Sequence, residues 1–155
     1  MTTTFETLRD EQAALIAALT PVSLEDVPFV QHIDERPLRD WAQEYPQACF
    51  RRFAIADVFD YMPPAISTYG TERVEGSHEV VIAYPVDYRY GAQNRRDRWD
   101  VMREDEKYVD ERIGLNHAYN AYSEGHCVRT SAVREEGPAV AFLVMTYVFR
   151  FDRAC

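Results

Sequence analysis

Apolar positions recur at helical spacing in two segments of the chain. Near its start, Thr3 and Glu6 form a capping pattern. The apolar residues that follow at helical spacing, with Gln12 as one polar interruption, are Phe5, Leu8, Leu15, Ile16 and Leu19. In the second segment, residues 95–113, steps of three and four separate Trp99, Met102, Glu106, Val109 and Ile113. Each pattern predicts an amphipathic helix, and the face of a sheet is the expected cover for its apolar side.

Two long extended segments lie between the predicted helices. Residues 49–61 and 73–90 are rich in aromatic and β-branched residues, which predicts strands. The first alternates imperfectly, which indicates a bulge or two covered faces, and Met62-Pro63-Pro64 is expected to end it. Pro85 in the second is expected at a bulge or a sheet edge, because proline has no amide N–H to donate.

The C-terminal part of the chain predicts a β-hairpin. Its strands cover residues 127–133 and 139–151, and Glu135-Glu136-Gly137-Pro138 supplies the turn. The polar residues 115–125, and residues 65–71 that follow the prolines, are expected to be loops.

The order of these elements predicts a single α+β domain over residues 1–155. A short strand at 29–33 and a short helix at 37–45 precede the first long strand, and no repeat or linker interrupts the chain. We expect an antiparallel or mixed sheet of about four or five strands, with the N-terminal helix and the helix at about 95–113 packed on it. The leading candidates for the core are Phe5, Leu15, Ile82, Trp99, Met102 and Phe142.

Composition and charge narrow the functional classes. The chain has 155 residues, with 17 basic and 26 acidic side chains and a formal net charge of −9. Such an excess of acid repels phosphate backbones, so no sequence-specific binding of nucleic acid is expected. The first residues carry no basic leader segment, and no apolar run approaches the roughly 18 residues of a membrane span, so neither secretion nor membrane insertion is expected. Cys49, Cys127 and Cys155 lack metal-like spacing and do not predict a disulfide scaffold.

No combination of residues in the sequence indicates a particular reaction. His126 and Cys127 are adjacent, but neighbouring residues on a strand point to opposite faces, so they do not predict a nucleophile and its base. Carboxylate pairs on the helix 95–113 lie among arginines, which favours an ion-paired surface over acid–base chemistry. The histidines lack the spacing of metal ligands; they are His32, His78, His117 and His126. The sequence therefore predicts a protein that is not an enzyme and that holds no metal and no cofactor.

Arginine and tyrosine mark the candidate contact surface. Lys107 is the only lysine among the 17 basic residues, and arginine and tyrosine are enriched in protein interfaces. A GC-rich genome would give the same bias toward arginine, and tyrosines that pack against the second helix would have no interface role, so both alternatives stay open. The subunit-interface candidates are Arg51, Arg52, Tyr88, Tyr90, Arg96 and Arg103.

Four features in one order along the chain suggest a known family. An amphipathic helix opens the chain, and a strand with the sequence Arg52-Phe53-Ala54-Ile55 follows a proline-marked stretch. A later strand ends in Ala83-Tyr84-Pro85, and a charged helix that contains Arg96-Asp97-Arg98-Trp99 comes shortly after it. The closing hairpin ends in Tyr147-Val148-Phe149-Arg150-Phe151. In these features the chain resembles the tail terminator proteins of long-tailed bacteriophages.

The resemblance implies a structural function without catalysis. Tail terminators form a homohexameric ring that caps the head-proximal end of the tail tube, ends its polymerisation and joins the tail to the head connector. The implied partners are further copies of the chain, the tail tube protein, and a head–tail connector or head-completion protein. The implied location is the virion, after assembly in the host cytoplasm. The loop 114–125 and the long stretch 20–48 depart from the family pattern.

Two other functions are compatible with the sequence. Neighbouring neck, connector and adaptor components of the phage particle share related architectures, so the chain could act one position away in the same assembly. A small-molecule-binding or hydrolytic α+β domain would instead need a deep, mostly apolar pocket. Its lining here would be residues 84–90 with His117 or His126.

Charge reversal at Arg96 and Arg103 tests the ring hypothesis. If both arginines contact acidic groups on a neighbouring subunit, exchanging both for glutamate is expected to weaken association. Light scattering of the purified variant would then give a lower mass than the parent protein gives. An unchanged mass distribution would contradict a role for these two side chains.

Overall fold

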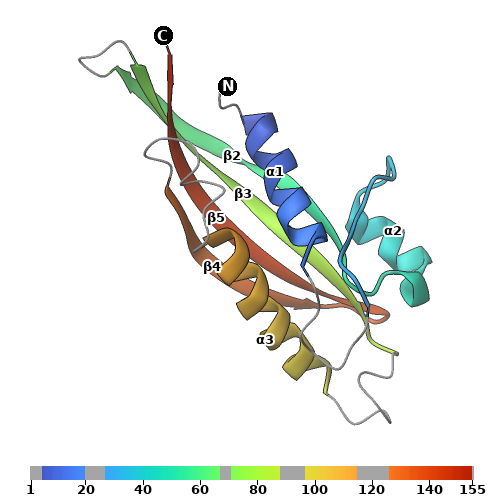
Figure 1. Ribbon diagram of the computed structural model, residues 1–155. Coiled ribbons are helices and arrows are strands. Elements are labelled where there is room, and N and C mark those ends of the chain that lie inside the picture. Colours follow the sequence, from blue (N-terminus) through green and yellow to red (C-terminus); the bar gives the residue numbers. More distant parts are fainter. Residues whose placement is uncertain (1–4, 20–26, 67–70, 88–96, 115–125, 155) are drawn as a thin grey trace.

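A mixed five-stranded sheet organises the described part of the chain. The computed structural model describes residues 5–19, 27–66, 71–87, 97–114 and 126–154. The sheet has the order β1-β2-β3-β5-β4, in which β1 runs parallel to β2 and every other pair is antiparallel. The strands are β1 (Val30–Gln31), β2 (Arg52–Ile66), β3 (Thr71–Pro85), β4 (His126–Glu136) and β5 (Val140–Ala154). The predicted α+β fold is therefore confirmed (Figure 1).

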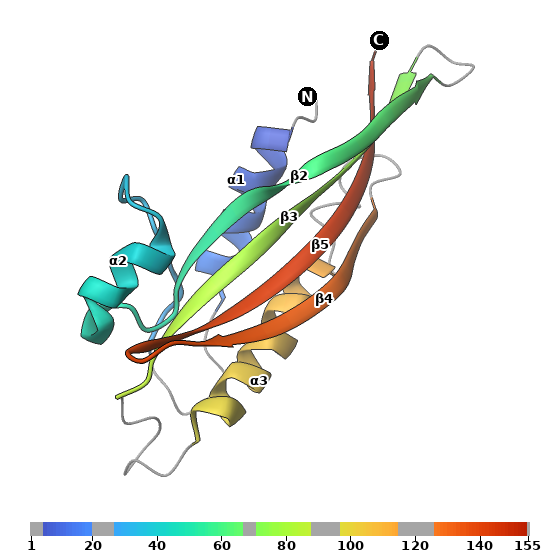
Figure 2. The same cartoon turned by 180° about the vertical axis from the view of Figure 1, so that it is seen from behind.

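Helices cover the two faces of this sheet unequally. α1 (Phe5–Ala17) and α3 (Arg98–Val109) lie on one face, and α2 (Leu38–Glu44) lies on the opposite face at one end (Figure 1, Figure 2). A 3₁₀ turn, Pro46–Ala48, follows α2, and a π-helical turn, Asp110–Gly114, extends α3. The strands β2, β3 and β5 continue beyond the helices as a long twisted extension (Figure 2). The prediction that the N-terminal helix and the second long helix pack on the sheet is confirmed.

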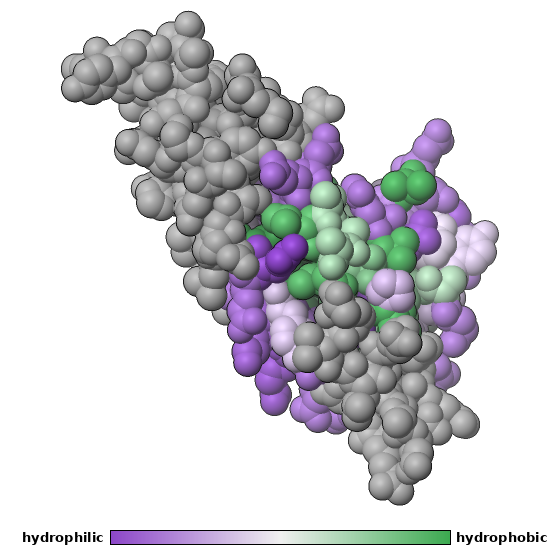
Figure 3. Space-filling view, in the orientation of Figure 1, coloured by the Kyte–Doolittle hydropathy of each residue, from purple (hydrophilic) through white to green (hydrophobic). Residues whose placement is uncertain are grey.

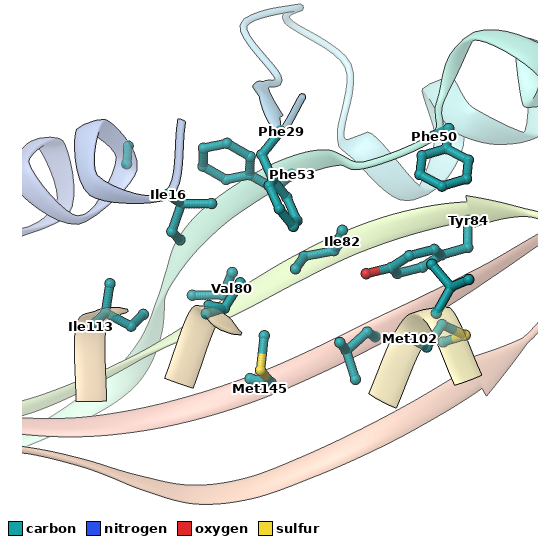
Figure 4. Close-up of a cluster of buried hydrophobic side chains, with 14 of the residues drawn as sticks. Ile16, Phe29, Phe50, Phe53, Val80, Ile82, Tyr84, Met102, Ile113 and Met145 are labelled. Carbon is teal, nitrogen blue, oxygen red and sulfur yellow. The ribbon is translucent and has the colours of Figure 1, made fainter. Parts of the chain in front are cut away.

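The larger core fills the space between the sheet and the layer of α1 and α3. Alternate residues of β3 and β5 face this layer because side chains on a strand alternate between its two sides. Burial of each large apolar side chain contributes about 1.5–3 kcal/mol to stability. The fully buried members include Ile16, Phe53, Val80, Ile82, Met102, Ile113, Leu143 and Met145 (Figure 4).

A smaller core lies on the opposite face, under α2. The intervening residues of β3 and β5 point this way, so the two central strands are apolar on both sides near this end of the sheet. The buried members are Leu38, Trp41, Ala42, Cys49, Val81, Ala83, Val140, Phe142 and Val144. Apolar residues therefore follow one another without alternation in these parts of β3 and β5.

The prolines of β2 do not end the strand, which corrects the prediction made from Met62-Pro63-Pro64. β2 continues to Ile66, so Ala65 and Ile66 belong to a strand and not to the expected loop, and Thr71 already belongs to β3. The pairing of β2 with β3 shifts register between Val58 and Met62 and again between Met62 and Ala65. These irregularities accommodate proline because β2 lies at an edge, where a missing N–H removes no ladder bond on the open side.

The helix predicted over 95–113 begins at Arg98 and ends in the π-helical turn Asp110–Gly114. Asp97 caps α3, and its side chain accepts a hydrogen bond from the Trp99 backbone N at 2.9 Å. Met102, Val109 and Ile113 are fully buried as the spacing predicts, whereas Trp99 is only partly buried. Val101 and Asp105 are also fully buried, so the inward side of the helix is wider than the predicted stripe.

The remaining expectations have mixed outcomes. The short strand near 29–33 and the short helix near 37–45 are present as β1 and α2. Pro85 is at neither a bulge nor an edge: it is the last residue of the central strand β3, opposite Val140. Ile82, Met102 and Phe142 are core residues as predicted, and Leu15 and Trp99 lie at its margin. The Phe5 side chain and the loop 115–125 lie outside the described residues.

Candidate functional site

Arg51 is the most constrained residue in the described part of the chain. Its backbone has a φ of 59°, in the left-handed region that a non-glycine residue seldom occupies. The Arg51 N–H donates to the Ala83 carbonyl at 3.0 Å, and the Arg51 carbonyl accepts from the Val30 N–H at 3.1 Å. The residue therefore lies where β1 and β3 both meet the start of β2, in a backbone conformation that costs strain energy.

The Arg51 guanidinium is fully buried and forms a two-point ion pair with Asp105 of α3. Nε donates to Oδ2 at 2.9 Å, and Nη2 donates to Oδ1 at 2.7 Å. Nη1 donates to the Val27 carbonyl at 2.9 Å. The rings of Phe29 and Phe50 lie 5.1 and 5.3 Å from the guanidinium carbon. The guanidinium is therefore held by a bidentate contact with the carboxylate and by the two aromatic rings.

Asp105 receives a third donor from the sheet. The Tyr84 hydroxyl donates to Oδ2 at 2.8 Å, and both Tyr84 and Asp105 are fully buried. Burial raises the pKa of the Asp105 carboxyl, while the hydrogen bonds from Arg51 and Tyr84 oppose this shift. All three side chains are shielded from solvent, so the cluster joins β2, β3 and α3 and offers no charge to a substrate.

A second group of polar side chains lies within the larger core. His78 is fully buried, 6.0 Å from the Tyr147 ring between centroids, and the Tyr147 hydroxyl donates to Asp110 Oδ1 of the π-helical turn at 3.3 Å. Burial lowers the pKa of His78 to about 3, and the charge of Arg9 adds to the effect, so the ring is neutral at pH 7. Gln12 of α1 is also fully buried, and its amide has no hydrogen-bond partner among the described residues.

The surface around α2 carries a stack of cationic and aromatic side chains. The Arg52 guanidinium carbon lies 3.9 Å from the Trp41 ring centroid, and Arg52 Nε donates to His32 Nδ1 at 2.9 Å. His32 Nε2 donates to the Arg36 carbonyl at 2.6 Å, because Nδ1 already accepts from Arg52. Arg52 is partly buried, so this interface candidate packs within its own chain and retains a part exposed to solvent.

Ion pairs connect α3 to the edge strand β4. Arg134 of β4 pairs with Glu106 at 3.4 Å and lies 5.6 Å from the Trp99 ring, and Arg98 pairs with Glu136. On the outer side of α3, Arg103 pairs with Asp100 at 3.7 Å, and its side chain is 68% exposed. Figure 3 shows apolar residues gathered near the middle of the described surface on the α1 side, with hydrophilic residues around them.

The six interface candidates have different places in the structure. Arg51 is fully buried, so it is not available to a neighbouring subunit, and the sequence offered no signal that this arginine, unlike Arg52, points inward. Arg103 is exposed and Arg52 is partly exposed. Tyr88, Tyr90 and Arg96 lie outside the described residues.

The structure also bears on the alternative of a small-molecule site. Tyr84, expected to line its pocket, is buried in the core and bonded to Asp105. His117 lies outside the described residues, and the side chains of His126 and Cys127 are not described. Within the described ranges, no three His, Cys, Asp or Glu side chains form a group that could hold a metal ion, and no helix is long and apolar enough to cross a membrane.

Asp105 is the buried charged residue that sequence reasoning missed. It lies between the apolar positions Met102 and Val109 on the inward side of α3, four residues after Val101. A single acid on an apolar stripe signals a buried charge that needs a cationic partner. The predicted stripe passed through Glu106 instead, because that position continues the alternation of steps of three and four.

Comparison with known proteins leaves the family open: no protein-family model and no curated protein matches the chain.

Substitution of Asp105 tests the role of the buried ion pair. Asp105→Asn leaves the Arg51 cation buried without its counter-ion, which is expected to lower the free energy of unfolding by about 3–5 kcal/mol. Tyr84→Phe removes one hydrogen bond to a charged group and is expected to cost about 1.5–3 kcal/mol. Urea denaturation measures both values. The double variant Arg51→Met with Asp105→Leu should be more stable than Asp105→Asn; a loss below 1 kcal/mol for Asp105→Asn would contradict this role.

The buried neutral His78 gives a pH-dependent stability. Its pKa is about 3 in the folded chain against a reference value of 6.5, so below pH 6.5 the unfolded chain binds a proton that the folded chain does not. The free energy of unfolding is expected to fall by about 1.4 kcal/mol per pH unit as the pH is lowered from 6.5 toward 5. Denaturation curves of the parent and of His78→Leu measure this slope, and equal slopes would show that His78 does not produce it.

Proposed function

We propose that the protein is a non-enzymatic structural subunit that assembles head-to-tail with copies of itself into a ring. We further propose that this ring is the tail terminator of a long-tailed phage. The observation that supports the ring is that β4 on one side of the sheet, and most of β2 on the other, have an edge without a strand partner among the described residues.

The two open edges belong to β4 and to β2, on opposite sides of the sheet. β4 is the last strand on one side of the sheet. On the other side, β1 pairs only with Arg52 and Phe53, so the part of β2 from Ala54 onward has no neighbouring strand within the described residues. An open edge presents a row of backbone N–H and C=O groups that can pair with another chain. A subunit with two such edges can therefore bind one neighbour at each.

The direction of the strands favours a closed ring. Three successive antiparallel pairings separate β2 from β4, so these two strands run in opposite directions. A neighbour generated by rotation about an axis along the strands would bring its β2 antiparallel to β4. A contact between two different patches is heterologous, and such contacts form a ring when the rotation closes.

The two edges differ in charge. The open part of β2, residues 54–66, contains Asp57 and Asp60 and no basic residue. The strand β4 contains two basic and two acidic residues, Arg129, Arg134, Glu135 and Glu136. Like charge disfavours contact between two β2 edges, whereas β4 brings basic residues that can face the acidic edge of β2.

The placement at the phage tail is supported by the family resemblance of the sequence. The proposed ring is a hexamer that contacts the tail tube protein on one side and a connector or head-completion protein on the other. A net charge of −9 per chain suits a channel that passes DNA without binding it. Another neck component of the particle is the alternative within the same assembly.

Mass photometry and negative-stain electron microscopy test the ring. The purified protein is expected to form rings, alone or on tubes of a phage tail tube protein, and to stop the growth of those tubes. Val133 is 53% exposed on the edge strand β4, and Val133→Lys is expected to weaken association by about tenfold, or about 1.4 kcal/mol, because charge on an edge opposes strand pairing.

Ala14→Lys is the matched control, since Ala14 is exposed on the helix α1 and the substitution adds the same charge away from both edges. Circular dichroism and thermal unfolding establish that both variants are folded. A protein that stays monomeric at high concentration with and without tubes would overturn the proposal.

A further inference from the structure

We infer that α1 is a cover over the larger core, which opens and closes while the sheet, α2 and α3 remain folded. This role of α1 does not depend on the proposed ring, because it concerns how one helix is held within a single chain. Three features support it: a buried amide that lacks a hydrogen-bond partner, the small apolar side that α1 turns inward, and the charged contacts that hold α3.

The buried amide belongs to Gln12 on the inward side of α1. Gln12 is fully buried, and neither its Oε1 nor its Nε2 has a hydrogen-bond partner in the described part of the chain. An amide taken out of water without a compensating hydrogen bond costs free energy, and that cost disappears when water reaches the amide again. The closed position of α1 is therefore disfavoured at a residue that opening would hydrate.

The apolar part of the inward side of α1 is small. Among the α1 side chains that the structure describes, only Ala13 and Ile16 are buried besides Gln12, and Leu15 is partly buried at the margin of the core. Ile16 lies in the larger core with Ile113 of the π-helical turn, against which α1 packs (Figure 4). One large apolar side chain and one alanine thus supply the fully enclosed apolar contact, and the Gln12 amide offsets part of the free energy of their burial.

α1 also lies over a second buried polar group. Burial lowers the pKa of His78 to about 3, and the charge of Arg9 on α1 adds to the effect, so α1 passes close to this ring of β3. His78 is fully buried in the closed structure. Opening of α1 would therefore give water access to two polar side chains, and hydration of both favours the open state.

The other helix on this face, α3, is held by charged contacts. Asp105 forms the two-point ion pair with buried Arg51, and Glu106 pairs with Arg134 of β4. α1 belongs to no strand pair, and all five strands follow it in the described chain. Release of α1 therefore keeps the sheet and the Arg51–Asp105 pair intact, whereas release of α3 would separate two buried charges. Because the least stably held elements open first, α1 is expected to open before α3.

Hydrogen exchange of the full chain, measured residue by residue, tests the cover. The amides of residues 11–16 are expected to have protection factors at least about tenfold lower than those of α3 and β5, because local opening is enough to expose them. Gln12→Met keeps the length of the side chain and removes the amide. It is expected to raise protection in α1 about tenfold and to leave protection in α3 unchanged.

Ala14→Met is the matched control, since it puts the same side chain on the exposed side of α1. It is expected to leave protection in α1 within about twofold of the parent, because alanine and methionine are both good helix formers. Equal protection of α1 and α3 in the parent would overturn the inference, as would a uniform gain in both helices with Gln12→Met. Lower protection of α1 in Gln12→Met would show that the amide binds an internal water, and would overturn it as well.

Labelling of a buried thiol gives a second readout. Ala13→Cys, in a chain with Cys127→Ser and Cys155→Ser, places a thiol on the covered side of α1. The matched control is Ala141→Cys, at a fully buried alanine of β5 in the same core. Cys49 is buried in both chains, and burial raises its pKa to about 12, so it adds the same low background.

A disulfide reagent such as DTNB is expected to modify position 13 at least about tenfold faster than position 141, and adding Gln12→Met is expected to slow modification at position 13 about tenfold. Equal rates at positions 13 and 141 would overturn the inference. Mass photometry of the same chains reports their oligomeric state, so the outcome for the cover is distinguished from the outcome for the ring.

Discussion

The fully buried ion pair between Arg51 and Asp105 fixes how the parts of this fold meet. Arg51 immediately precedes β2 in a left-handed conformation. Its carbonyl accepts from the Val30 N–H and its N–H donates to the Ala83 carbonyl, while its side chain binds Asp105 of α3 and the carbonyl of Val27. A buried ion pair adds little net stability, because desolvation of two charges offsets their attraction. Losing one partner is costly, however, so any arrangement that separates β2 from α3 is disfavoured.

The buried polar side chains of the larger core serve to hold the fold together. The Arg51 network and the group around His78 and Tyr147 are enclosed between the sheet and its helices, where Tyr84 and Tyr147 direct their hydroxyls to carboxylates. What the fold leaves open lies at its margins: the edge of β4, the edge of β2 beyond β1, and the exposed outer side of α3. The two strand edges are the basis of the ring that we propose.

Periodic segments of the sequence predicted their elements well, and the failures have local causes. The stripe through Met102, Val109 and Ile113 identified a helix that packs on the sheet. Met62-Pro63-Pro64 was expected to stop β2, but an edge strand tolerates proline where its open side needs no N–H. Of the candidate contact residues, Arg51 and Arg52 are neighbours of the same type. Arg51 is buried against Asp105 on the α3 side, whereas Arg52 lies partly exposed beside Trp41 on the α2 side.

The sequence by itself determined the class of fold, the two long amphipathic helices, the closing hairpin and the acidic character of the chain, because each depends on spacing or composition within one segment. The tertiary structure alone decided the partner of Arg51, the burial of Asp105 and His78, and the order of strands that puts β2 and β4 at opposite sides of the sheet. These features join residues far apart in the chain: 54 positions separate Arg51 from Asp105. The pattern of residues within one segment cannot predict such distant pairs, because they form only when separate elements pack together.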